Sequence, residues 1–343
     1  MFANNIGVHA QANSTSCAQI LKQAQKNYDQ GQLESIPALL KDCISYGFTK
    51  PEKIAAYRLI ILTNLFLDEQ AQAESNMRQL LILEPDYKPN KSLDPIEYIN
   101  LYNSFKAIPF LSLGIFFGAN NSNSKVVNHF SVHDTKSYSP TLSPSISFHG
   151  GIGVEWLLKP YLFLSTDVMF ALRSFTTANK VYALSEVTST ESQAHIELPL
   201  TMKISFFNSK KLRPFIRAGT AFALLMSSSG KLQRKSTTTN QIDFEGRDLD
   251  LKPQRNGFNM CMVAGAGLNY KVGYGYMSLD VRYLYGMSNL VNSEVRYNYF
   301  DEQLTNYGYI DSDISLNSLQ ISLGYYYSLY KVKKISTKNN ASQ

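Results

Sequence analysis

The chain has few charged residues, few cysteines and no long apolar run. Only 17% of its 343 residues are Asp, Glu, Lys or Arg, and it contains three Cys and one Trp. No window approaches the roughly 20 apolar residues that a membrane-spanning helix needs. The longest candidate, from Leu59 to Leu67, is interrupted by Thr63 and Asn64. The net charge of +6 includes no Lys/Arg block with interleaved aromatic residues, so nucleic acid is not an expected partner.

Aromatic residues, by contrast, are abundant. The chain contains 22 Tyr and 19 Phe, with an overall hydrophobic content of 44%. A composition that is poor in charge and rich in Tyr is unusual for a cytosolic enzyme. It is typical of a β-barrel whose outer face meets lipid and whose inner face is polar.

The first residues carry an incomplete secretion signal. Ala10-Gln11-Ala12 has the small-x-small form of a cleavage site and follows a short apolar stretch, but a charged segment and a full apolar core are missing. We interpret residues 1–16 as the remnant of a signal peptide. A disordered leader is the alternative.

Residues 17–106 show helical periodicity with start and stop signals, and they predict five helices. Thr49 and Glu52 are spaced as a capping box at the start of the third helix. The first and third helices start about 33 residues apart, as do the second and fourth, which is the period of a helix-turn-helix repeat. The segment from Ala71 to Pro85 resembles the second helix of a tetratricopeptide repeat. The usual Trp and Gly positions of the first helix are absent. The resemblance implies two such repeats, with the fifth helix as a cap.

The three cysteines divide between the two halves of the chain. Cys17 and Cys43 fall in the paired first and second helices, where an oxidising periplasm favours a disulfide; two buried free thiols are the alternative. Cys261 lies in a candidate strand. Neither spacing suits a metal site, and we expect no metal and no cofactor.

After Lys106 the hydrophobic period changes from 3.6 to 2, and eight alternating segments follow. They are 109–118, 144–157, 161–173, 194–207, 213–226, 258–271, 275–287 and 315–330. Long and short connections alternate between them, which is typical of a bacterial outer-membrane barrel with long loops outside and short turns in the periplasm. The predicted fold class is therefore α+β and multidomain: a tetratricopeptide-like helical domain at 17–106, then an eight-stranded antiparallel transmembrane β-barrel at 107–330.

Apart from Arg213 and Lys271 at segment ends, the charges in these segments are Glu155, Asp167, Arg173, Glu197, Lys203, Arg217, Asp280 and Arg282. All eight fall on the polar parity of their strands. A Lys or Arg facing lipid at mid-depth costs about 2–4 kcal/mol, so this parity should face the lumen. Because an eight-stranded barrel is only wide enough for its side chains, we expect a packed ion-pair network and no channel.

Several short motifs in the barrel segment support a family resemblance. They are Ile196-Glu-Leu-Pro-Leu-Thr-Met-Lys203, Arg213-Pro-Phe-Ile-Arg-Ala-Gly219, Leu279-Asp-Val-Arg-Tyr283 and Leu323-Gly-Tyr-Tyr326. In this order they resemble the outer-membrane β-barrel family of Bacteroidota, the PorT-like group. The resemblance implies an integral outer-membrane barrel, and it implies no single activity, because members serve varied roles, some of them in secretion.

Two clusters of polar residues are candidates for a chemical site. Ser147 and His149 share a strand face, with Asp167 on the next strand, and a nucleophile with a base would need such a pair. We interpret them as ordinary lumen residues and predict no catalytic residue. Asp311 and Asp313, with Asp301 and Glu302, are interpreted as a solvated acidic loop, because no Gly-punctuated calcium loop is present.

The leading functional hypothesis is a non-enzymatic outer-membrane protein. Outer-membrane lipid would surround its barrel, and its periplasmic helical domain would dock periplasmic or outer-membrane proteins, within an assembly or secretion complex. Tyr57, Tyr98 and Tyr102 are the predicted partner-binding residues, and residues 331–343 are predicted to be a basic periplasmic tail. Two alternatives remain: adhesion or ligand binding through the outer loops, and a lipid hydrolase with its site at the barrel rim.

Overall fold

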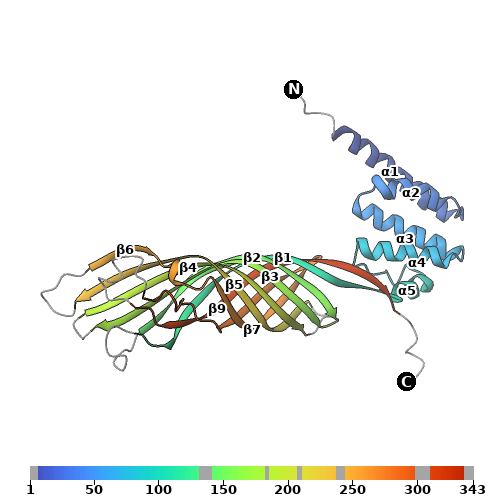
Figure 1. The fold of residues 1–343 in the computed structure, drawn as a ribbon. Coiled ribbons are helices and arrows are strands. Elements are labelled where there is room, and N and C mark those ends of the chain that lie inside the picture. Colours follow the sequence, from blue (N-terminus) through green and yellow to red (C-terminus); the bar gives the residue numbers. More distant parts are fainter. Residues whose placement is uncertain are drawn as a thin grey trace, which may run out of the picture. The chain divides into compact units, whose positions relative to one another are not determined.

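The computed structural model describes residues 7–130, 141–181, 185–206, 211–236, 244–297 and 310–335. The chain divides into two compact units, one formed by residues 1–109 with 330–343 and the other by residues 110–329. Figure 1 labels the helices of the first unit and most strands of the second. None of the helices in the described ranges combines the length and the apolar character needed to cross a membrane.

The helical unit contains the five predicted helices. They are α1 (Gly7–Asp29), α2 (Ile36–Tyr46), α3 (Lys50–Phe66), α4 (Gln70–Leu83) and α5 (Ile96–Asn103). Local signals set several of their ends. Gly31 takes a positive φ of 76° directly after α1. Thr49 and Glu52 form the expected capping box before α3, in which the Thr49 backbone N–H donates to Glu52 Oε2 at 2.8 Å.

The first helix starts earlier than predicted. Residues 7–16 belong to α1, because no Pro or Gly interrupts the helix between Val8 and Asp29. The expected boundary at residue 17 is therefore not a boundary of secondary structure. Residues 1–6 lie outside the described ranges, and the interpretation of a signal-peptide remnant stays a prediction.

The helices bury two adjoining apolar clusters. The first joins α1, α2 and the start of α3, and includes Cys17, Leu40 and Leu59. The disulfide between Cys17 and Cys43, the expected pair, lies in this cluster. Gly47 follows α2 at this point, and a Cβ there would lie only 2.2 Å from Cys17 Sγ. The second cluster joins the end of α3 to α4 and α5.

The predicted basic tail at 331–343 was wrong for its first residues. Residues 331–334 continue the last strand, and Val332 is buried in the second helical cluster. The backbone N–H of Ile335 donates to the Ser104 carbonyl at 2.7 Å. The alternation of apolar Val332 with Lys331 and Lys333 is typical of a strand, whereas the cluster of positive charges had indicated a solvated tail. Residues 336–343 lie outside the described ranges.

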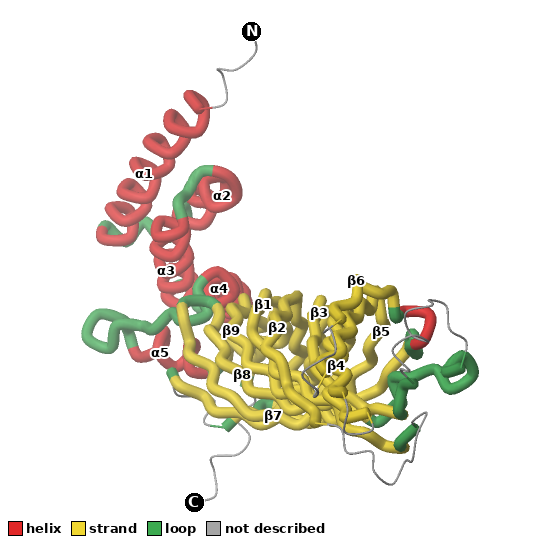
Figure 2. Tube along the Cα trace, turned by 90° about the vertical axis from the view of Figure 1, so that its left-hand side faces the viewer, coloured by secondary structure: helices red, strands yellow, loops and turns green. Residues whose placement is uncertain are grey.

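The second unit is built from antiparallel strands. They are β1 (Phe105–Asn128), β2 (Thr141–Lys159), β3 (Leu162–Val181), β4 (Ser185–Ser205), β5 (Leu212–Ser236), β6 (Phe244–Asp250), β7 (Phe258–Val272), β8 (Gly275–Gly286) and β9 (Asp313–Lys334). Their order is β4-β3-β2-β1-β9-β8-β7-β5-β6, and an additional pairing of β4 with β5 turns the sheet into a ring. Figure 2 shows this ring as a curved wall of strands.

All eight predicted segments form strands, but most run further than expected. The predicted loops 119–143, 174–193 and 227–257 contain the ends of β1 to β5, and β6 lies within the third. The sequence prediction ended each strand where apolar residues gave way to Ser, Thr and charged residues. Backbone pairing continues past that point because the ladder does not require apolar side chains, as Thr176 paired with Thr190 shows.

Each strand keeps two chemically different faces. On β4, Ile196, Leu198 and Leu200 are 39–45% exposed on the outer face, whereas Glu197 and Lys203 on the inner face are fully buried. This is the reverse of a water-soluble sheet protein, and it is the arrangement that lipid requires.

Candidate functional site

The eight predicted lumen charges all lie buried inside the ring. They come from β2, β3, β4, β5 and β8, and each is at most 4% exposed. Arg217 of β5 occupies the centre, since its guanidinium lies 3.1 Å from Asp280, 3.7 Å from Glu155 and 4.0 Å from Asp167. The expected network is therefore present in the structure.

Two further cations complete this central group. Arg282 lies 2.5 Å from Asp167 and 2.7 Å from Asp280, while Lys203 lies 2.7 Å from Glu155. The central group thus contains three acids and three bases, and each charge lies within 4.0 Å of an opposite charge. A buried charge without a partner is strongly unfavourable, so the members of this network stabilise the fold only together.

Aromatic rings enclose Lys203 on its remaining sides. The ammonium lies 4.0 Å from the Phe215 ring centre and 5.3 Å from that of Tyr276, which stacks on Tyr326. Cation–π attraction adds to the ion pair here because the site is desolvated. Gly153 makes room for these rings, since a Cβ at that position would lie 2.7 Å from the Tyr326 hydroxyl.

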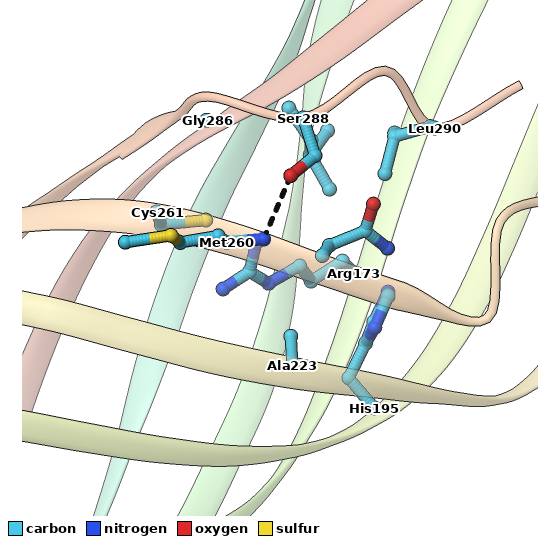
Figure 3. A pocket seen from close by; sticks show the side chains of 10 residues that line it. Arg173, His195, Ala223, Met260, Cys261, Gly286, Ser288 and Leu290 are labelled. Atoms are coloured by element: carbon cyan, nitrogen blue, oxygen red, sulfur yellow. Dashed lines mark hydrogen bonds between the residues drawn. The ribbon is translucent and has the colours of Figure 1, made fainter.

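The other predicted pair, Arg173 and Glu197, lies apart from the central group. Their side chains approach to 2.5 Å. Beside them is a small cavity lined by Arg173, His195, Asn259 and Cys261, with the Met260 N–H donating to Ser288 Oγ at 3.0 Å (Figure 3). Its free space suits about one water molecule and is far below what an organic substrate requires.

A second buried network lies among residues that the sequence prediction assigned to loops. Arg255 contacts Glu191 at 2.7 Å and Asp311 at 2.7 Å, and all three side chains are buried. Ser228 also donates to Glu191, at 2.6 Å. The interpretation of Asp311 as part of a solvated loop was therefore wrong.

One member of this second network, Glu191, could have been predicted from the sequence. Glu191 has the same parity on β4 as Glu197, so the inward-facing alternation of that strand continues through Gln193 and His195. Arg255 had no such signal, because it follows a short 3-10 helix (Lys252–Gln254) and pairs through an isolated bridge with Val291.

Asp313 was also expected to be solvated, and it is not. Its carboxylate pairs with Arg296 and accepts hydrogen bonds from Asn128 and Asn289, at 2.9 and 2.8 Å. The other two acids of the predicted acidic loop, Asp301 and Glu302, lie outside the described residues.

The candidate catalytic pair is not assembled. His149 Nε2 lies 2.7 Å from Ser322 Oγ on β9, and no hydrogen bond joins it to Ser147 within the described ranges. Asp167, the proposed third member, is held by Arg282. Among the described residues, no three His, Cys, Asp or Glu side chains converge as metal ligands.

The predicted partner-binding tyrosines of the helical unit differ in exposure. Tyr57 and Tyr102 are half-buried, but Tyr98 is fully buried and donates a hydrogen bond to Tyr87 at 3.0 Å. Burial raises the pKa of Tyr98, and the hydrogen bond to Tyr87 raises it further. Tyr98 is therefore a core residue, and assigning it to a binding surface was wrong, because it is buried beside Tyr87.

Residues 109–292 match the family of outer membrane protein beta-barrel domains. The chain belongs to this family. It is thus an outer-membrane β-barrel protein that also carries a helical unit outside the matched region. No curated protein sequence matches the chain.

Solved structures similar to this barrel are also outer-membrane proteins. The outer membrane protease OmpT of Escherichia coli matches at 10% identity with a TM-score of 0.37, covering 65% of this chain and 98% of its own. OprG of Pseudomonas aeruginosa matches at 8% identity and 0.33, covering 64% and 97%. Ail, the attachment invasion locus protein of Yersinia pestis, matches at 11% and 0.27, covering 64% and 100%.

Proposed function

We propose that this protein is a non-enzymatic outer-membrane protein whose barrel is an anchor and whose periplasmic helical unit docks envelope proteins. The observation that carries the proposal is the exposure of three large apolar side chains on the helical unit. Tyr46 is 96% exposed, Phe66 77% and Leu93 73%. Side chains of this size are costly to leave in water and are enriched where proteins bind one another.

The barrel interior supports the anchor role. The central ion pairs fill the middle of the ring, and the network of Arg255 fills it again further along the strands. The small cavity beside Arg173 suits about one water molecule, which leaves no room for a substrate at that place.

The orientation is part of the proposal. The turns after β2, β4 and β7 are short, and the chain enters and leaves the ring at the end that carries these turns. Short turns face the periplasm in bacterial outer-membrane barrels, and this supports a periplasmic helical unit.

The finer family assignments are proposals too. α1 packs on α2 and α3 on α4, which supports a tetratricopeptide-like pairing of helices. The barrel motifs support a place in the PorT-like group of Bacteroidota, some of whose members serve secretion. A periplasmic or outer-membrane protein of that machinery is the expected partner.

Substitutions of these exposed apolar side chains test the proposal in the native outer membrane. We expect Tyr46→Ser combined with Phe66→Ser and Leu93→Ser to abolish the capture of partners in crosslinked affinity purification, with heat-modifiability of the barrel unchanged. Lys41→Ser, exposed on α2, is the matched control. Capture of the same partners by the triple variant would refute helical docking.

Binding through the outer end of the barrel is the second candidate. It is favoured by the order of that end, where β3, β4 and β5 continue as paired strands and Arg255 holds Glu191 and Asp311. An ordered surface loses less entropy on binding than free loops. Removal of the β5–β6 hairpin beyond Gly230 should then abolish cell-surface ligand binding while partner capture by the helices persists.

A further inference from the structure

The second apolar cluster of the helical unit contains a residue from the far end of the chain. Val332, near the end of strand β9, is 4% exposed among Met77, Leu80 and Leu101 of α4 and α5. Phe105, the first residue of β1, is buried in the same cluster. The helices therefore share their core with the first and last strands of the ring.

Polar contacts fix the same segment in place. The Ile335 backbone N–H donates to the Ser104 carbonyl at 2.7 Å, directly after α5. Lys334 Nζ lies 2.6 Å from Glu74 Oε1 on α4. The end of β9 is thus joined to both α4 and α5, by main chain at one and by side chain at the other.

The first apolar cluster has no such dependence. Its residues all come from 17–60, with partly buried neighbours up to residue 67, and the disulfide between Cys17 and Cys43 holds it within a short stretch of chain. Its contacts form between residues close in sequence, so the entropy of closing those loops is small. The second cluster needs a segment that follows the whole ring in sequence.

We propose that the α4–α5 half of the helical unit reaches its folded state only when the last strand of the barrel is in place. The α1–α2 half folds on its own. Folding of α4 and α5 then depends on completion of the barrel. Strand β9 pairs with β1 and β8 to finish the ring, and its last residues complete the helical core. If the helical unit docks partners as proposed above, docking follows insertion.

Hydrogen exchange on the full-length protein in detergent micelles tests the dependence on Val332. Val332→Asp should accelerate amide exchange in α4 and α5 roughly ten-fold or more, because a charge replaces a core methyl pair. Exchange in α1, α2 and the strands should not change. Lys333→Ala, exposed on the same strand, is the matched control. Val332→Ala gives the same test with a smaller effect if the Asp variant fails to insert. Unchanged protection of α4 and α5 in both variants would overturn the proposal.

Refolding tests the order of events. The oxidised full-length chain is diluted from urea into buffer with or without micelles and labelled with brief deuterium pulses. Without micelles the barrel does not form, and we expect protection in α1 and α2 alone. With micelles, protection of α4 and α5 should rise together with the heat-modifiable gel band. Protection of α4 and α5 in chains that lack a folded barrel would refute the proposal, whatever the protein's partners are.

Discussion

The helical unit and the barrel bury opposite kinds of side chain. The helical unit buries Leu, Ile and Met and exposes charges, with a disulfide added in its first cluster. The barrel buries Arg, Lys, Asp and Glu and exposes Leu, Ile and Tyr. The same chain thus follows two patterns because its halves meet two solvents: water penalises exposed apolar area, and lipid penalises exposed charge and unpaired backbone.

The two interiors should respond differently to the loss of one side chain. Removal of an apolar side chain leaves a cavity, whereas removal of one ion-pair member leaves its partners charged and buried. Substitutions that exploit this difference separate the two units experimentally.

The largest effect is expected at the centre of the lumen network. Arg217→Ala leaves Asp280 and Glu155 with one cation each, and it should destabilise the barrel by about 3–5 kcal/mol. Urea unfolding in lipid vesicles, followed by the loss of the heat-modifiable band, measures it. Lys159→Ala, exposed at the end of β2, should leave the midpoint unchanged. A midpoint for Arg217→Ala equal to that of the control would show that the network does not stabilise the fold.

One substitution made in both units compares their cores directly. Leu80→Ala in the second helical cluster should cost about 2–5 kcal/mol, because the side chain is fully buried and leaves a cavity. Leu200→Ala on the outer face of β4 should cost clearly less, since lipid fills the space that the side chain leaves. Thermal unfolding of the helices and urea unfolding of the barrel give the two values. Equal costs would contradict the assignment of Leu200 to the lipid face.

The disulfide should stabilise only the α1–α2 half of the helical unit. Replacing Cys17 and Cys43 by Ala should destabilise the α1–α2 half by about 2–4 kcal/mol and leave the barrel unaffected. Hydrogen exchange in α1 and α2 measures the loss. Cys261→Ala, a substitution of the buried free cysteine, controls for the removal of a thiol. Faster exchange in the strands after loss of the disulfide would contradict the independent folding of the α1–α2 half.

The sequence predicts side-chain orientation correctly in regular helices and strands, where hydrophobic residues recur with a fixed period. Alternation on β4 located Glu197 and Lys203 inside the ring, and helical spacing located Leu80 in the core. It does not predict burial that depends on contacts between segments distant in sequence. Tyr98 is buried because Tyr87 packs over it from the segment before α5, and Val332 is buried because the chain returns to the helices after the ring is complete.

The second buried network, formed by Arg255, Glu191 and Asp311, shows the same limit of sequence-based prediction. Arg255 is buried with Glu191 of β4 and Asp311 of the segment before β9, and neither its sequence neighbours nor any period marks that position. Local pattern therefore fixes which face a residue occupies in a regular element. It does not show which irregular segments fold back onto the core.

The smallest predicted effect concerns the hydroxyl pair that made Tyr98 a core residue. Tyr98→Phe removes the donor of the 3.0 Å hydrogen bond to Tyr87 and should destabilise the helical unit by about 1 kcal/mol, since the ring still fills its site. Tyr102→Phe, half-buried on the same helix, is the matched control. A double-mutant cycle with Tyr87→Phe isolates the pair, and thermal unfolding of the helices measures it. Additive losses would show that the two hydroxyls do not interact. Because burial and this bond both raise the pKa of Tyr98, its phenol should also resist ionisation in alkaline titration followed by absorbance, and ionisation at the ordinary tyrosine pH in the folded protein would contradict its burial.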